Sequence, residues 1–100
     1  MQERSIPEAA RRDPNSVEML RVWIAEHSLW CSIKVGMYRD VPGVAEETAW
    51  GTILADATRH IATALAKEHG AKSDRTIALI REAYLAELDE PTSEATGEFV

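Results

Sequence analysis

The sequence contains few of the residues that mark a disulfide-rich or low-complexity chain. Its 100 residues include one cysteine, Cys31, four prolines and five glycines. A single cysteine excludes an internal disulfide, which is typical of proteins from a reducing compartment. The low proline and glycine content excludes a collagen-like or low-complexity chain. With 45% hydrophobic and 28% charged residues, the composition indicates one globular domain.

Long apolar runs are also absent. No segment approaches the roughly 20 apolar residues that a membrane span needs. Residues 1–16 are polar and lack the apolar stretch of a secretory signal. We therefore expect a soluble cytoplasmic protein with no membrane partner.

Basic residues are missing from the end of the chain. Six acidic residues and no basic residue follow Arg81, so the whole net charge of −6 lies in that stretch. An acidic end on an otherwise neutral chain repels phosphate backbones, so we expect no nucleic-acid partner. The simplest role of the acidic residues 89–100, which we expect to form a flexible tail, is solubility.

The apolar residues that are present predict a β-hairpin after an irregular arm at residues 1–16. Between residues 18 and 38, apolar side chains alternate with others on two consecutive segments, a pattern typical of strands. A four-residue loop at 26–29 would place Ile24 opposite Cys31. The same register would place Arg21 opposite Lys34, an unfavourable pair of like charges.

Two helices are expected after the hairpin, over residues 45–69 and from Ser73 or Asp74 to about 88. The first carries an apolar stripe at helical spacing, made of Trp50, Ile53, Leu54, Ala57, Ile61, Ala64 and Leu65. Gly70 predicts its end. The sequence thus predicts an α+β fold of the ββαα type, a single domain over residues 17–88, with the helices packed on one face of the hairpin.

Four segments carry a resemblance to a known family: EMLRVWI, SIKVGMY, AWGTILADATRHIATAL and ELDEPTS. They resemble the bacterial domain-of-unknown-function 5076 family, over roughly residues 16–93. The resemblance implies a small bacterial protein with no assigned activity, and it supplies no catalytic residue.

Two groups of residues are candidates for ligand or metal chemistry. Asp56, Arg59 and His60 share the polar face of the first helix, and the Asp56–His60 spacing suits two side chains that meet. They predict a weak small-ligand or metal site, whereas a solvated surface cluster is the simpler interpretation. Cys31 and His27 would pair as thiol and base, but Cys31 lies on the apolar side of the hairpin and is expected to be a core residue.

The second face of the hairpin is unusually aromatic for a solvated surface. We expect it to contact a partner through Met19, Arg21, Trp23, Trp30 and Tyr38. A second copy of the chain, the N-terminal arm and a foreign partner are the alternatives for covering it. The sequence therefore predicts a non-enzymatic interaction module, a homodimer without a cofactor, with small-ligand or metal binding as the alternative function.

Overall fold

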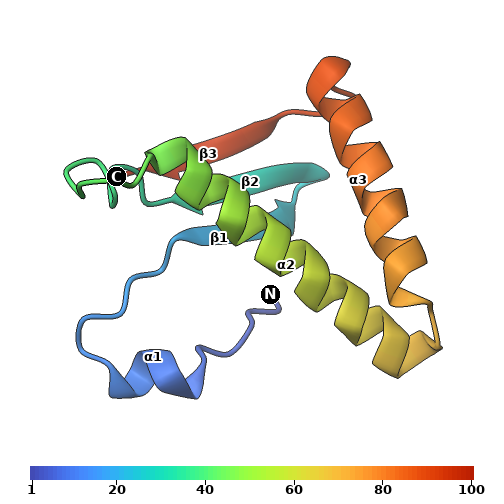
Figure 1. Ribbon diagram of the computed structural model, residues 1–100, viewed down its shortest axis with the longest axis horizontal. Coiled ribbons are helices and arrows are strands. Elements are labelled where there is room, and N and C mark those ends of the chain that lie inside the picture. The colour runs from blue at the N-terminus through green and yellow to red at the C-terminus, as the bar shows by residue number, and fades with distance from the viewer. The chain divides into compact units, whose positions relative to one another are not determined.

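The computed structural model describes residues 1–100 and contains three helices and one three-stranded sheet (Figure 1). Its strands lie in the order β1-β2-β3. The α+β class is therefore confirmed, but ββαα is incomplete, because a short helix precedes the hairpin and a third strand follows the helices. In chain order the elements are α1 (Glu8–Arg12), β1 (Leu20–Ala25), β2 (Ser28–Ile33), α2 (Glu46–His69), α3 (Ser73–Asp89) and β3 (Ala95–Phe99).

The hairpin closes through a two-residue turn rather than the expected four-residue loop. Glu26 and His27 both have positive φ, 51° and 60°, as the central residues of a type I′ turn do. Ile24 consequently pairs with Leu29 and not with Cys31, so the expected register is wrong by two residues. A shift of two keeps every side chain on its expected face. It also replaces the unfavourable Arg21–Lys34 pair by Arg21 opposite Ser32.

The segment expected to be a flexible acidic tail forms a strand. β3 pairs in parallel with β2, with Trp30 opposite Thr96 and Ile33 opposite Phe99. Beyond the strand, the Val100 amide donates to the Ile33 carbonyl at 3.1 Å and the Val100 carbonyl accepts from Val35 at 2.8 Å. The expectation failed because β3 gains its hydrogen bonds from a strand more than 60 residues earlier, as parallel pairing through a long crossover requires.

Strand pairing gathers the apolar side chains of the sheet on one face. Residues opposite each other on neighbouring strands point to the same side, and side chains alternate along each strand. One face is wholly apolar, with Leu20, Val22, Ile24, Leu29, Cys31, Ile33, Ala95, Gly97 and Phe99. The other face carries the two tryptophans together with Arg21, Ser32, Thr96 and Glu98.

The arm at residues 1–16 is not wholly irregular, because it contains α1. Pro7, with φ −58°, precedes the first turn of that helix, where proline is tolerated because no intrahelical bond needs its missing N–H group. The Ser16 hydroxyl then donates to the Ala10 carbonyl at 2.9 Å.

The two long helices begin and end within a residue of their expected bounds. Gly70 ends α2 in the left-handed conformation with φ 69°, and its amide donates to the Ala66 carbonyl. At the first residue of α2, the Glu46 carboxylate accepts the amides of Gly36 at 2.5 Å and Tyr38 at 3.1 Å. No helix is long and apolar enough to cross a membrane.

The chain divides into a sheet unit, Met1–Val35 with Ala95–Val100, and a helical unit, Gly36–Glu94. The assignment of residues 17–88 to one domain, and the packing of the helices on the hairpin, stay predictions.

Candidate functional sites

The aromatic face of the sheet is built around a pair of tryptophans. Trp23 on β1 lies directly opposite Trp30 on β2. The Trp30 indole donates to the Ala25 carbonyl at 3.0 Å, and its side chain remains 40% exposed. Trp23 is half-buried. Both rings therefore keep apolar surface that water contacts.

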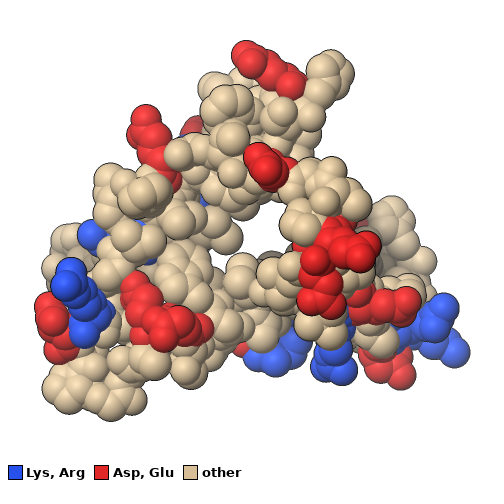
Figure 2. Space-filling model, turned by 90° about the horizontal axis from the view of Figure 1, so that it is seen from above, with Lys and Arg blue, Asp and Glu red and all other residues tan.

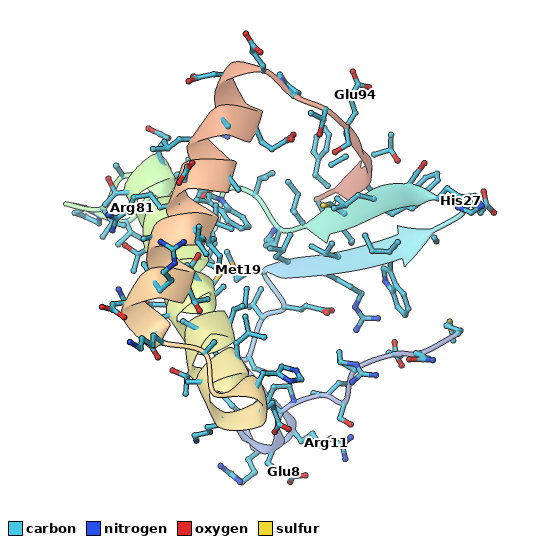
Figure 3. All side chains as sticks on the ribbon, turned by 90° about the vertical axis from the view of Figure 1, so that its right-hand side faces the viewer. Glu8, Arg11, Met19, His27, Arg81 and Glu94 are labelled. Carbon is cyan, nitrogen blue, oxygen red and sulfur yellow. The ribbon has the colours of Figure 1, made fainter.

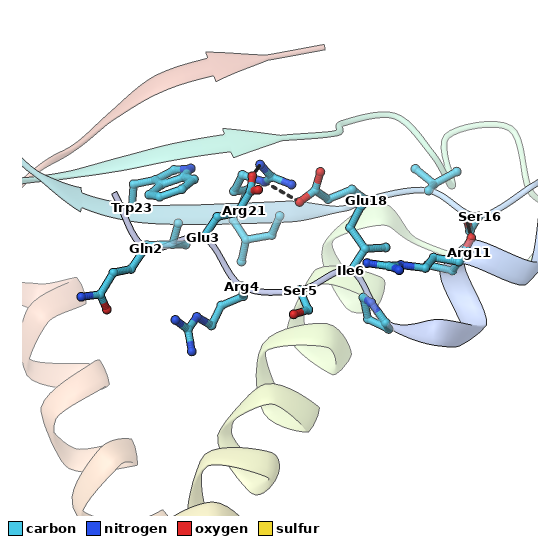
Figure 4. Close-up of a pocket in the computed structure, with 15 residues that line it drawn as sticks. Gln2, Glu3, Arg4, Ser5, Ile6, Arg11, Ser16, Glu18, Arg21 and Trp23 are labelled. Atoms are coloured by element: carbon cyan, nitrogen blue, oxygen red, sulfur yellow. Dashed lines mark hydrogen bonds and ion pairs between the residues drawn. The ribbon is translucent and has the colours of Figure 1, made fainter.

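The N-terminal segment lies along the same face (Figure 4). The Arg21 guanidinium donates to Glu3 and to Glu18, each at 2.7 Å. The Glu18 hydrogen bond, with the Glu3 bond adding to it, raises the pKa of Arg21 above its ordinary value. Gln2, Glu3 and Trp23 line one cavity of about 720 Å³ between the arm and β1. The arm thus already occupies part of the surface expected to meet a partner.

The five expected interface residues belong to two different units. Met19 stands at the start of β1 (Figure 3), in the same unit as Arg21, Trp23 and Trp30. Tyr38 belongs to the helical unit. β2 ends at Ile33, and Gly36 then turns the chain with φ 82° before Tyr38.

The expected ligand cluster on α2 is only partly assembled. Arg59 forms an ion pair with Asp56, and both side chains are mainly exposed. His60 is exposed and forms no side-chain hydrogen bond or ion pair. No group of three or more His, Cys, Asp or Glu side chains in the chain is placed to hold a metal ion. Arg59 also lines a cavity.

That cavity is a groove between α2 and α3 of about 300 Å³. It was not expected from the sequence, because it needs the side-by-side placement of the two helices. Its α3 side follows an i, i+3, i+4, i+7 pattern, which marks one face of a helix, with Ile77, Ile80, Arg81 and Tyr84. Its α2 side is formed by Gly51, Leu54, Ala55, Thr58 and Arg59.

The apolar stripe of α2 is not the surface on which α3 packs. α3 packs along a flank of small residues, where Ala62 is 1% exposed, and Thr76 on α3 is the chain's only other buried residue. At 3.6 residues per turn, the stripe lies roughly 110° around the helix axis from this flank. Ile61 is 48% exposed and Leu54 and Leu65 are each 37% exposed. Within the helical unit, α3 therefore leaves most of the expected apolar stripe uncovered.

Cys31 and His27 do not form a thiol–base pair. Cys31 lies on the apolar face, opposite Val22 and Gly97. His27 is at the tip of the β1–β2 turn (Figure 3), four residues away, or about 13 Å along an extended strand. The structure therefore supports the interpretation of Cys31 as a small apolar residue of the sheet.

The family assignment rests on most of the chain. Residues 3–92 match the family model DUF5076, a domain of unknown function. The chain belongs to the DUF5076 family. This confirms the resemblance found in the sequence and leaves the activity open.

A solved structure has a similar fold. It is described as a "putative pyruvate dehydrogenase from the photosynthetic bacterium Rhodopseudomonas palustrus CGA009". It is 26% identical, with a TM-score of 0.69, and the similarity covers 98% of this chain and 94% of that one. No curated protein matches the chain.

Proposed function

We propose that this DUF5076 protein is a non-enzymatic interaction module that works as a homodimer in the bacterial cytoplasm. The observation that carries the proposal is the apolar stripe of α2, most of which α3 leaves uncovered. Its residue Ile61 is 48% exposed, although the stripe has the spacing of a buried helix face. A stripe of this kind is stabilised when a second apolar surface removes it from water.

The exposed apolar residues of the α2 stripe support an apolar partner. Within the helical unit, Leu54 and Leu65 of the α2 stripe are each 37% exposed and Ile61 is 48% exposed. The interfaces of permanent homodimers are more apolar than the rest of a protein surface, so this stripe has the composition that such an interface needs. Large uncharged areas are visible on the face shown in Figure 2.

A second copy of the chain is the occupant that the charges favour. The stripe contains no charged residue between Trp50 and Leu65, so two copies meet there without like-charge contact despite their net charge of −6. A two-fold axis would place the same stripe against itself. Two helical hairpins would then form a four-helix arrangement, in which helices pack closely around shared apolar positions.

We place the interface on α2 rather than on the aromatic face of the sheet. Glu3 is bonded to Arg21, and Gln2 shares a cavity with Trp23. A partner on that face would first have to displace the arm. Within the helical unit, no segment comparable to the arm lies over the α2 stripe.

The experiment is the solution mass by light scattering, with a matched pair of charge insertions on α2. We expect the wild-type protein to have twice the chain mass. Ile61→Glu places an unpaired charge in the interface and should give a monomer. Thr63→Glu adds the same charge two residues away on the exposed polar face and should remain a dimer.

Circular dichroism must show that Ile61→Glu keeps its helices, and Ala64→Glu provides a second test if it does not. A wild-type protein that is monomeric at the highest soluble concentration would overturn the proposal. That result would favour the predicted packing of the helices on the hairpin. Equal masses for the Ile61→Glu and Thr63→Glu variants would overturn the placement of the interface.

A further inference from the structure

We propose that the groove between α2 and α3 binds a small amphipathic carboxylate, with a carboxylate head and a short apolar body. The groove shares only Leu54 with the proposed dimer stripe, and this proposal does not depend on the dimer, because the groove opens along the helix–helix contact. Its volume of about 300 Å³ lies at the lower end of small-molecule sites, which are mostly apolar with a few polar groups that orient the ligand.

The apolar part of the groove would hold the body of the ligand. Leu54 and Ala55 from α2 and Ile77 and Ile80 from α3 contribute only aliphatic side chains. Gly51 adds open space, because a Cβ built on it meets nothing within 4 Å. Binding of a short hydrocarbon chain against this surface is stabilised by about 25 cal/mol for each Å² of apolar area removed from water.

The charged part of the groove would hold the head group. Arg59 and Arg81 come from different helices and line the same cavity. Arg81 forms no ion pair, so its N–H donors are available to a ligand. Arg59 bonds to Asp56, but a guanidinium has five N–H donors and one carboxylate leaves some of them unused. Arginine binds carboxylates through two parallel hydrogen bonds.

The groove between α2 and α3 is positively charged, although the chain as a whole is acidic. The chain carries 17 acidic and 11 basic residues, yet none of the groove residues is acidic. Tyr84 and Thr58 add hydroxyl groups to the lining. The Thr58 hydroxyl is already donated to the Leu54 carbonyl at 2.9 Å, whereas the Tyr84 hydroxyl forms no hydrogen bond within the chain. An anion with an apolar body therefore fits the residues that line the groove better than a cation or a neutral polar ligand does.

The test is a calorimetric titration of the full chain with three probes. Hexanoate has both the head and the body, 1-hexanol has the body without the charge, and inorganic phosphate has a charge without the body. We expect saturable binding of hexanoate and at least tenfold weaker binding of the other two. Phosphate binding as tightly as hexanoate would indicate an anion site only and would overturn the amphipathic ligand.

Two matched variants then locate the site. Arg81→Gln should weaken hexanoate binding about tenfold or more, as expected for the loss of a charged hydrogen bond. Arg75→Gln removes the same charge from an exposed position of α3 outside the groove and should leave the affinity unchanged. Circular dichroism verifies the fold of both. No saturable hexanoate binding, or an equal loss in the two variants, would overturn the site whether or not the protein is a dimer.

Discussion

Gly97 lies directly opposite Cys31 in the parallel ladder between β2 and β3, with no room for a side chain. A Cβ built on Gly97 would lie 1.8 Å from the Cys31 carbonyl oxygen. The φ of Gly97 is 139°, in a region that residues with side chains rarely adopt. The pairing of the last strand with the sheet therefore depends on glycine at this position.

Gly97→Ala should detach β3 from β2. Strain at such a backbone position costs on the order of 1–3 kcal/mol, and overlap with the Cys31 backbone adds to it. We expect a loss of this order in chemical denaturation, with faster hydrogen exchange of the β3 amides. Gly51→Ala is the matched control. It lies inside α2 in open space, so it should stabilise the protein by about 1 kcal/mol. Unchanged exchange in β3 would contradict the predicted role of Gly97.

The sequence predicted the elements whose signal is local. The helices of residues 46–69 and 73–89 follow from apolar spacing and from Gly70. The two hairpin strands follow from alternation, which also assigned each side chain to its face. These patterns require only neighbours a few residues apart.

The features missed by the sequence prediction depend on distant parts of the chain. β3 has a short sequence, ATGEF, and no alternation of its own, so only its partner β2 makes it a strand. The turn at Glu26 and His27 lacks the glycine or asparagine that usually marks a type I′ turn. Of the groove between the long helices, only Arg59 was a candidate. Arg81 and Tyr84 gain significance only when α3 lies against α2.

Glu87 and Thr92 should make the end of α3 sensitive to acid. The Glu87 carboxylate accepts the Thr92 hydroxyl at 2.5 Å and the Thr92 amide at 3.0 Å. The hydroxyl bond first, and then the amide bond, lowers the pKa of Glu87 below its ordinary value. The folded form therefore has the lower pKa. The stabilisation is present above the unfolded pKa and is lost as the pH falls through the folded pKa.

An NMR titration of the side-chain carboxyl carbons measures this directly. Thr92→Ala removes the hydroxyl donor, so it should raise the pKa of Glu87 toward the ordinary value. Ser93→Ala is the control, since Ser93 forms no bond with Glu87, and it should leave the pKa of Glu87 unchanged. An ordinary Glu87 pKa in the wild-type protein would contradict the prediction.

His60→Ala should change the free energy of unfolding by less than about 0.5 kcal/mol, as is usual for exposed positions. His60 is exposed on the polar face of α2 and makes no side-chain bond. Ala62→Leu, two residues later, is the contrasting variant. Ala62 is 1% exposed, and overpacking a buried site costs roughly 1–3 kcal/mol. A loss of 2 kcal/mol or more for His60→Ala in urea denaturation would show that a ligand or a partner contacts His60.

The N-terminal arm should cover Trp23 in solution. Glu3 bonds to Arg21, and Gln2 and Trp23 line one cavity, so removing residues 1–14 should expose the ring and shift its fluorescence to the red. Trp30→Phe and Trp50→Phe in the same chain leave Trp23 as the only tryptophan. Glu3→Arg places a like charge beside Arg21 and should cause part of the same shift. Glu8→Arg, outside the cavity, should cause none.

The deletion of residues 1–14 and the variant Trp23→Arg together decide which surface forms the dimer interface. If the second copy binds the α2 stripe, removing the arm changes the measured mass only by the deleted residues, and Trp23→Arg leaves the dimer intact. A dimer that dissociates with Trp23→Arg, while the emission is unaffected by the deletion, would move the interface to the aromatic face. The covering role of the arm would then be wrong, because the partner rather than the arm would keep water from Trp23.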